Sequence, residues 1–522
     1  MRDDSCRMLT RRDVLKAASV LGAAGAAGLG PRRGQAQGNR KPALTIALPS
    51  NPETVDPHQF RSVLTGSALA LMCETLLIRD PRTMELKPHL ATSWRNLDPT
   101  TWEFKLRPGV KFHNGEDFNA ESVKFTLERA LGPKLNTLSK VVWPPSIGQE
   151  ARIVDPLTVR ITTKKPDPAL PNRLAAESLN MMPARGLADF REKFVTDRVI
   201  GTGPYRFVEF VVGDRLGVEA NPAYWGPKPA SQRVVWQVIP DAATRVAALQ
   251  RGAVDAVVNL PVPLIPQVES DPNLTVYSQL GSTVHLLLLN ANANPVLKDR
   301  RVRQALAHAI DREAIIKTLY GGRGRVQNSV VARQVTNAID PGAHAYDPAR
   351  ARKLLADAGH ANGIELALWQ ATGRWSQAEE AAQVIAGYWE KVGVRTSLQT
   401  LEWGEYNRRA GRALHKDAAY YAFVNGIWDP SYLTQRFLPT YASFRYWNAE
   451  GELQRLIEEH EQLFDAAKRR EVAAQVQRGL QEEVGWLFLW QLDEIFGLSK
   501  KVKGFHMRPD HLIWVRDAYA EA

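Results

Sequence analysis

The sequence lacks three residue patterns that commonly carry catalysis or phosphate binding. A Gly-x-Ser-x-Gly turn would present a serine nucleophile, a His-Glu-x-x-His helix would hold zinc, and a Gly-x-x-x-x-Gly-Lys loop would cradle phosphates. None of them occurs. The glycine-rich stretch 321–324 is not a dinucleotide fingerprint, because Gln327 stands where the last glycine should fall. We therefore expect no catalytic residue and no cofactor, with hydrolysis by some other constellation as the alternative.

The histidines and cysteines do not predict a metal centre or a disulfide. His308 and His344 share no metal-ligand spacing, so a metal site would have to be assembled from distant residues. Cys6 lies in the N-terminal segment described below, which leaves Cys73 as the single cysteine of the mature chain. Cys73 follows an apolar run, which is typical of an inert buried thiol. No metal and no intramolecular disulfide are expected.

Residues 1–36 have the composition of an export signal. Arg11 and Arg12 precede an uncharged run at residues 17–30, which is too short to span ~30 Å of hydrocarbon. The arginine pair resembles a twin-arginine signal, although Val14 occupies the usual phenylalanine position. We expect cleavage after Ala36 and twin-arginine export to the periplasm. An ordinary Sec signal and a cytosolic amphipathic helix are the alternatives.

Length and composition predict a folded chain of two large lobes. The 522 residues exceed the ~250 to 300 that one core supports. Hydrophobic residues make up 44% and charged residues 24% of the chain, which is typical of a globular protein. Removing residues 1–36 takes away seven basic and three acidic residues and lowers the formal net charge from +11 to +7. The remaining basic residues are scattered, so nucleic acid is not an expected partner.

Short strand-like runs alternate with capped helices, which predicts an α/β fold. Asp347-Pro348 predicts a helix start that ends at Gly359, and Asp241 predicts another that closes at Gly252. Ser376 with Glu379 predicts a capping box. A buried apolar stripe is expected between Asp299 and Leu319, at Val302, Leu306, Ala309, Ile315 and Leu319. Strands are expected at residues 44–48, 158–162, 234–239, 284–289 and 364–369.

The stretch from Leu90 to Gly115 is the most specific part of the sequence. Trp102, Phe104 and Leu106 alternate as on a half-buried strand, and two turns follow at Pro108-Gly109 and Asn114-Gly115. Asn119 is placed to cap the next helix, which carries Val123, Leu127 and Leu131. This stretch resembles the signature of the family 5 solute-binding proteins, the dipeptide and oligopeptide receptors of ABC importers. Other segments match in the family's order, namely 55–58, 201–205, 221–226, 301–313 and 346–359.

The resemblance implies a two-lobe α/β receptor of the large periplasmic-binding-protein class, with a hinge between the lobes. It places the first part of lobe I at residues 37–286, with an extra subdomain at about 85–200, lobe II at 287–489, and a return segment of lobe I at 490–522. The implied function is capture of a peptide-like or other oligopeptide-sized polar solute for ABC permease subunits in the inner membrane. A monomer is expected. A secreted hydrolase or a sensory binding protein on the same fold is the alternative.

The resemblance also implies where the solute would lie. Peptide-binding relatives hold the ligand's α-amino group with an aspartate four residues before a proline, and here Gly426 has that place before Pro430. Asp429 could substitute, with a turn role as the alternative. Arg61 suggests an anionic or polar solute, with a solvated surface arginine as the alternative. Loop packing is the alternative for Arg374 and Trp375, and core packing is the alternative for the other aromatic candidates. The ligand-binding candidates are Arg61, Val63, Arg374, Trp375, Trp403, Tyr420, Phe423, Asn425, Trp428 and Asp429.

Overall fold

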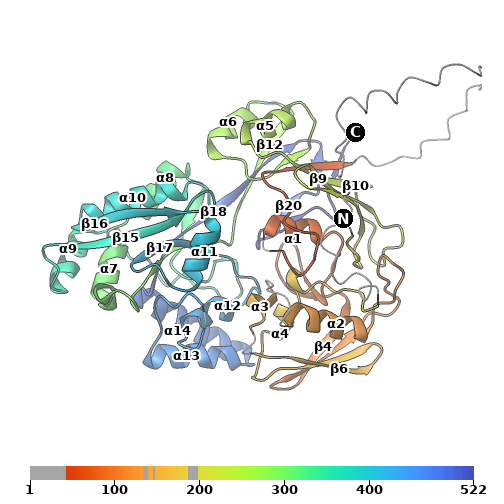
Figure 1. The fold of residues 1–522 in the computed structure, drawn as a ribbon, viewed down its shortest axis with the longest axis horizontal. Helices are drawn as coiled ribbons and strands as arrows, with labels where there is room; N and C mark the ends of the chain where they lie inside the picture. Colours follow the sequence, from red (N-terminus) through yellow and green to blue (C-terminus); the bar gives the residue numbers. More distant parts are fainter. Residues whose placement is uncertain are drawn as a thin grey trace, which may run out of the picture. The chain divides into compact units, whose positions relative to one another are not determined.

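The computed structural model describes residues 43–521 except 61, 133–138, 145–146, 186–197 and 442. The predicted export signal lies outside these residues. Strands and helices alternate through the described chain (Figure 1), as the sequence predicted. No helix in this part of the chain is both long and apolar enough to cross a membrane.

The first sheet is built around β1 (Leu44–Leu48), a strand whose Ile46 and Leu48 are fully buried. β1 runs parallel to β10 (Arg233–Val238) and β11 (Ala256–Val257), which requires crossover connections. The other strands are β8 (Tyr205–Val211), β9 (Arg215–Ala220) and β12 (Leu274–Leu280), and the accompanying helices are α1 (Val63–Leu69), α5 (Ala242–Gln250) and α6 (Ile265–Glu269). We call the lobe that contains this sheet the first lobe.

The second sheet is centred on β13 (Val284–Leu289), which is buried along its whole length. Its strands run in the order β16, β15, β17, β13, β18, with bounds β14 (Gly324–Val326), β15 (Ile364–Ala371), β16 (Val394–Leu401), β17 (Ala418–Phe423) and β18 (Trp486–Ser499). Helices of this second lobe are α7 (Arg300–His308), α8 (Arg312–Leu319), α9 (Pro348–Asp357), α10 (Ala378–Glu390), α11 (Trp403–Gly411), α12 (Ser431–Thr434), α13 (Gly451–Gln462) and α14 (Ala466–Glu483).

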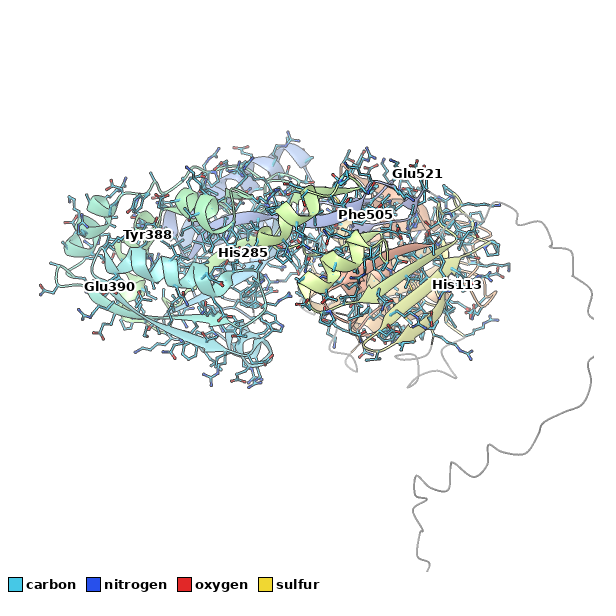
Figure 2. The ribbon with its side chains drawn as sticks, turned by 90° about the horizontal axis from the view of Figure 1, so that it is seen from above. His113, His285, Tyr388, Glu390, Phe505 and Glu521 are labelled. Carbon is cyan, nitrogen blue, oxygen red and sulfur yellow. The ribbon has the colours of Figure 1, made fainter. Side chains whose placement is uncertain are left out.

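β18 belongs to both sheets. Up to Leu492 it pairs with β13 and β14, and from Asp493 onward it pairs with β12 and β11. The chain also passes from the first sheet to the second between β12 and β13, at residues 281–283. His285 lies near this passage, between Tyr388 of the second lobe and Phe505 of the first (Figure 2). The two lobes are therefore joined by two adjacent extended segments, an arrangement that suits hinge bending.

The first lobe carries a further sheet in the order β4, β5, β7, β6, covered by α2. Trp102, Phe104 and Leu106 of β5 are buried in a core of their own with Val123 and Leu127 of α2. The bounds are β4 (Ala91–Asp98), β5 (Thr101–Leu106), β6 (Glu150–Asp155), β7 (Thr158–Thr162) and α2 (Ala120–Leu131). Smaller elements are β2 (Leu77–Arg79), β3 (Leu86–Pro88), α3 (Ser139–Val142), α4 (Leu170–Arg173), β19 (Val502–Lys503), β20 (His506–Met507), β21 (Ile513–Trp514) and β22 (Tyr519–Ala520).

Most helix starts follow the prediction, because Asn119, Asp241 and Asp347 each accept a hydrogen bond from the first turn. The predicted capping box at Ser376 is wrong. Gln377 adopts a left-handed conformation with φ 54° and is itself the residue before α10, so Ser376 lies outside the helix. The stripe from Val302 to Leu319 is divided between α7 and α8, since Asp311 caps a second helix.

Candidate functional site

The two lobes contact each other at the loop that follows β17, residues 424–430, which we call the 424–430 loop. Arg79 of the first lobe donates hydrogen bonds to the carbonyl of Ile427 at 2.5 Å and to Asn172 Oδ1 at 3.1 Å. A side chain at Gly426 would begin 3.5 Å from Val142 of the first lobe. These contacts correspond to a closed arrangement of the lobes around this loop.

The 424–430 loop is held in shape by Asn425. Its Nδ2 donates to the carbonyl of Asp429 at 2.8 Å, and its Oδ1 accepts from the amides of Ile427 and Asp429 at 3.3 Å. Trp428 has φ 58° and is buried, which is an uncommon conformation for a bulky residue. Asn425 therefore stabilises the backbone that presents the loop to the first lobe.

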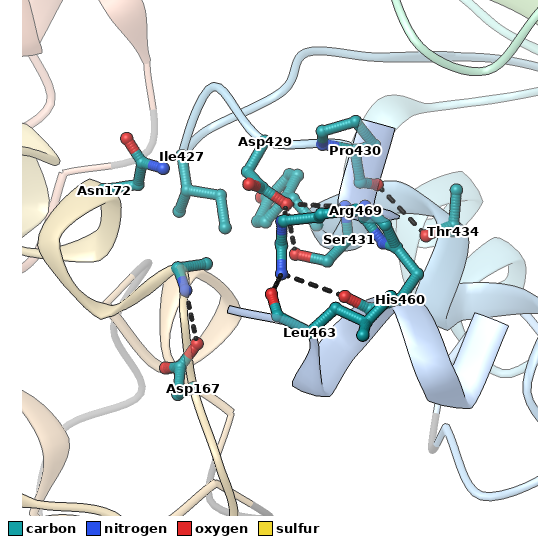
Figure 3. Close-up of polar contacts among 12 residues, drawn as sticks. Asp167, Asn172, Ile427, Asp429, Pro430, Ser431, Thr434, His460, Leu463 and Arg469 are labelled. Carbon is teal, nitrogen blue, oxygen red and sulfur yellow. Dashed lines mark hydrogen bonds and ion pairs between the residues drawn. The ribbon is translucent and has the colours of Figure 1, made fainter. Parts of the chain in front are cut away.

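Asp429 is committed to an internal ion pair (Figure 3). Its carboxylate lies 2.7 Å from Arg469 of α14 and accepts hydrogen bonds from the amide and the hydroxyl of Ser431. Burial alone would raise the pKa of this carboxyl, but Arg469 and Ser431 outweigh burial and hold the pKa below its usual value. The negative charge of Asp429 is thus neutralised within the protein. These contacts give Asp429 a structural role in the turn before Pro430.

An aromatic cluster brings together several of the predicted site residues. Trp375 and Trp403 meet edge to face with ring centroids 5.4 Å apart, and the guanidinium of Arg374 lies 4.8 Å from the ring of Trp403. Tyr421 contacts Trp375 at 5.3 Å and Phe423 at 4.7 Å. Arg374 is exposed and both tryptophans are partly buried, so these side chains are available to a ligand.

Of the remaining predicted residues, Tyr420 still contacts Trp375, with ring centroids 5.8 Å apart. Tyr420 points to the opposite face of β17, where it is fully buried and its hydroxyl is 2.8 Å from Nδ1 of His285. Val63 begins α1 in the first lobe and is 37% exposed. Arg61 lies outside the described residues. The structure thus gathers Trp375, Trp403, Phe423 and Trp428 in one cluster, with Arg374 stacked on Trp403. Asn425 and Asp429 lie in the 424–430 loop and make contacts within the second lobe.

Sequence reasoning missed two residues next to this loop, Tyr432 and Arg436. They are four residues apart on the helical turns after Pro430, in α12 and in the 3₁₀ turn Gln435–Phe437. The guanidinium of Arg436 lies 5.3 Å from the ring of Tyr432. Their four-residue spacing places them on one helical face. This spacing is the signal in the sequence that could have paired them.

A buried carboxylate in the first lobe, Glu74, was also missed. Glu74 is 2% exposed, and it accepts hydrogen bonds from Thr202, Tyr224 and Trp225 and pairs with Arg516. Burial would raise the pKa of this carboxyl, but His89 and Arg516 overcome that effect and hold it at about 2. Two of the family-like segments, 201–205 and 221–226, therefore donate hydrogen bonds to the same carboxylate.

His308 and His344 have backbone partners, and Cys73 lies in the core. The rings of His308 and His344 lie 5.1 Å apart, but each bonds a backbone carbonyl, at Ala345 and Gln481. No group of three or more potential metal ligands occurs among the described residues. Cys73 is buried, and burial raises the pKa of its thiol, as expected for an inert side chain.

Glu461 of α13 is partly buried opposite charged residues of the first lobe. Burial raises the pKa of its carboxyl to about 7, although Arg173 and Lys165 oppose this rise. In the unfolded chain the carboxyl would titrate near 4.5. The folded protein therefore binds this proton more tightly, and the free energy of unfolding falls as the pH rises from 4.5 to 7.

We expect Glu461→Gln to remove about 1 kcal/mol of this pH dependence, after allowance for solvent screening. Urea unfolding at pH 4.5 and at pH 7 measures the effect. Glu459→Gln, on the same helix at 38% side-chain exposure, is the matched control and should keep the wild-type slope. Equal slopes for Glu461→Gln and wild type would contradict the assignment.

Two lobes joined by two adjacent extended segments, with sheets covered by helices, define a periplasmic-binding-protein fold. A family model for bacterial extracellular solute-binding proteins, family 5, matches residues 85–444. The chain belongs to this family, and it is a solute-binding receptor.

Similar proteins agree with this assignment. Heme-binding protein A of Haemophilus influenzae is 29% identical over 81% of this chain and 82% of its own length. Glutathione-binding protein GsiB of Pectobacterium atrosepticum is 27% identical over 91% of this chain and 93% of its own. The periplasmic binding protein DppA of Helicobacter pylori, in complex with the peptide STSA, shares the fold with a TM-score of 0.79 and 23% identity, covering 92% of this chain and 99% of that one.

Proposed function

We propose that this chain captures a peptide-like or other oligopeptide-sized polar solute between its lobes in the periplasm and delivers it to the permease subunits of an ABC importer. The observation that carries the proposal is the bridge from Arg79 of the first lobe to the carbonyl of Ile427 in the second. Such a contact exists only when the lobes are closed, so a solute that fits between them favours the closed state. The name of the relative from Pectobacterium atrosepticum makes glutathione a candidate solute.

The pairing of the strands supports a proposal for the lobe boundaries. We place the first lobe at residues 43–280 and 493–521 and the second at residues 284–492, with residues 281–283 and the middle of β18 as the hinge. Export through the twin-arginine pathway, cleavage after Ala36 and a monomeric state belong to the same proposal.

Calorimetric titration with a panel of peptides, glutathione and other polar metabolites tests the proposal, together with X-ray scattering with and without each solute. A receptor retains a solute at about micromolar affinity and contracts when it binds. Retention without contraction, or no retention at all, would contradict the proposal. Mass spectrometry of peptide and ester mixtures after incubation tests the absence of catalysis, and turnover would favour a secreted hydrolase.

Trp403→Ala is expected to weaken solute binding by about 1–2 kcal/mol, since a partly exposed aromatic ring at a binding site is a typical hot spot. Its cost in folding should be at most about 1 kcal/mol, because the ring is only partly buried. Titration calorimetry and urea unfolding measure the two effects. Tyr346→Ala, an aromatic residue of the second lobe at 42% exposure, is the control and should bind normally. Unchanged affinity would remove Trp403 from the site.

A further inference from the structure

Arg436 lies in an aromatic cage beside the 424–430 loop. Its guanidinium is 5.0 Å from the ring of Phe423, 5.3 Å from Tyr432, 5.2 Å from Tyr441 and 5.5 Å from Phe444. The residue is only 3% exposed. Tyr441 and Phe444 are partly buried, so they form the most accessible side of the cage.

The charge of Arg436 lacks the counter-charge that burial requires. No carboxylate of the described residues lies within ion-pair distance of it, and its Nε has no hydrogen-bond partner among them. Aromatic faces attract the cation and the hydroxyl of Tyr432 interacts with it, but a guanidinium carries five N–H donors, and these contacts leave the one on Nε unused. Other buried arginines do have polar partners: carboxylates for Arg173, Arg303, Arg469 and Arg508, and backbone carbonyls for Arg245 and Arg312.

The cage borders the contact between the lobes. A Cβ on Gly426 would lie 3.3 Å from the hydroxyl of Tyr432, and Tyr432 forms one wall of the cage around Arg436. An acidic side chain at position 426 would thus begin against Tyr432, the ring that also contacts this cation. The chain has glycine there, so the positive charge is left uncompensated at the point where the two lobes meet.

Tyr421 lies near both Arg436 and a second arginine, Arg374. Arg374 stacks on Trp403, and Trp403 lies 6.1 Å from Tyr421. Burial raises the pKa of Tyr421 to about 12, and the charges of Arg436 and Arg374 both oppose this rise. No ion pair of Arg374 occurs among the described residues either. Two unpaired cations therefore converge on one part of the second lobe.

We propose that Arg436, assisted by Arg374, is the anchor for an oxyanion of the solute, so that the receptor selects solutes with a carboxylate or phosphate group. The inference rests on the proposed function and narrows its substrate class. A guanidinium binds either group in a bidentate manner. On closing, the bound oxyanion supplies the counter-charge and the hydrogen-bond acceptors that Arg436 lacks in the protein itself.

Matched probes test the acid preference of the purified protein: Ala-Ala-Ala against its C-terminal amide, glutathione against its dimethyl ester, and phosphoserine against serine. We expect wild type to bind at least one acidic member at least tenfold more tightly than its uncharged counterpart. A difference in affinity within the first two pairs indicates a carboxylate ligand, and a difference within the phosphoserine pair indicates a phosphate ligand. Arg436→Met should abolish the preference, and Arg436→Lys should retain part of it. Equal binding of acid and counterpart by wild type, or a preserved preference in Arg436→Met, would overturn the proposal.

Gly426→Asp is the most specific variant, because it adds the missing carboxylate next to Tyr432. It should neutralise Arg436, raise the thermal midpoint of the unliganded protein and remove the acid preference. Gly426→Asn has nearly the same size without the charge and should keep the preference. Loss of the preference in both variants would indicate a steric effect and would overturn the electrostatic assignment.

The binding of small anions tells a failure of this inference apart from a failure of the proposed function. Acetate and inorganic phosphate should raise the thermal midpoint of wild type, and Arg436→Met should lose this response. If organic solutes bind but neither small anion acts through Arg436, the anion anchor is wrong while the receptor function stands. If both anions act through Arg436 but no organic solute in a broad panel is retained, the receptor function fails instead. A drop of several degrees in the unliganded midpoint of Arg436→Met, with the acid preference intact, would assign Arg436 a purely structural role.

Discussion

Glu74→Ala is expected to lower the free energy of unfolding by about 3–5 kcal/mol, the cost of breaking a buried ion pair by removal of one partner. The substitution leaves Arg516 without its carboxylate and leaves the donors of Thr202, Tyr224 and Trp225 without an acceptor. Three separate parts of the first lobe lose their common partner. Urea unfolding at pH 7 measures the change. A loss below about 1 kcal/mol would show that the network adds little to stability.

Glu74→Gln is the matched variant, because it keeps an acceptor and the volume but removes the charge. The pKa of Glu74 is about 2 when folded and near 4.5 when unfolded, so the carboxylate stabilises the protein above pH 4.5. This stabilisation, about 3 kcal/mol, is lost as the pH falls from 4.5 to 2. The glutamine variant should lack this part of the acid sensitivity. Acid unfolding curves that coincide for wild type and Glu74→Gln would contradict the assignment.

Asp429→Ala is expected to cost about 3–5 kcal/mol of folding stability and to weaken solute binding at least tenfold, by about 1.4 kcal/mol or more. Removal of the carboxylate leaves Arg469 buried and unpaired, and Ser431 loses the acceptor that orders the start of α12. The 424–430 loop ends at this turn, so its contact with the first lobe is disturbed as well. Unfolding by urea and titration calorimetry measure the two losses separately.

Asp429→Asn and the double variant Asp429→Asn, Arg469→Met separate charge from shape. The single variant keeps an acceptor for Ser431 but leaves Arg469 without a counter-charge. The double variant removes the unpaired cation too, so it should be more stable than Asp429→Asn. If the double variant loses as much stability as Asp429→Asn and Arg469→Met lose together, the two residues contribute independently. The ion pair would then not be what orders the loop.

The elements that depend on local sequence were predicted well. Asn119, Asp241 and Asp347 cap helices because a short polar side chain reaches amides two or three residues away, and this interaction needs no tertiary partner. Trp102, Phe104 and Leu106 alternate in sequence, and the strand that they form buries them as expected. The predicted capping box at Ser376 was wrong, since Gln377 adopts a left-handed conformation that the motif alone does not reveal.

The candidate site was predicted in part. Trp375 and Trp403 could be named from their positions along the family pattern, and the structure brings them together. Tyr420 and Phe423 lie three residues apart on one strand, so strand geometry sends them to opposite faces, and only Phe423 faces the cluster with Trp403. Whether these residues bind the solute stays a prediction.

The sequence by itself determined the family, the α/β class and most helix starts and strands of this receptor, because those depend on patterns read over a few neighbouring residues. Only the tertiary structure decided which charges are paired. Glu74 meets Arg516 from 442 positions away, and Asp429 meets Arg469, whereas Arg436 meets aromatic rings and no carboxylate. Distance along the chain says nothing about distance in space, and the free energy of a buried charge depends on the latter.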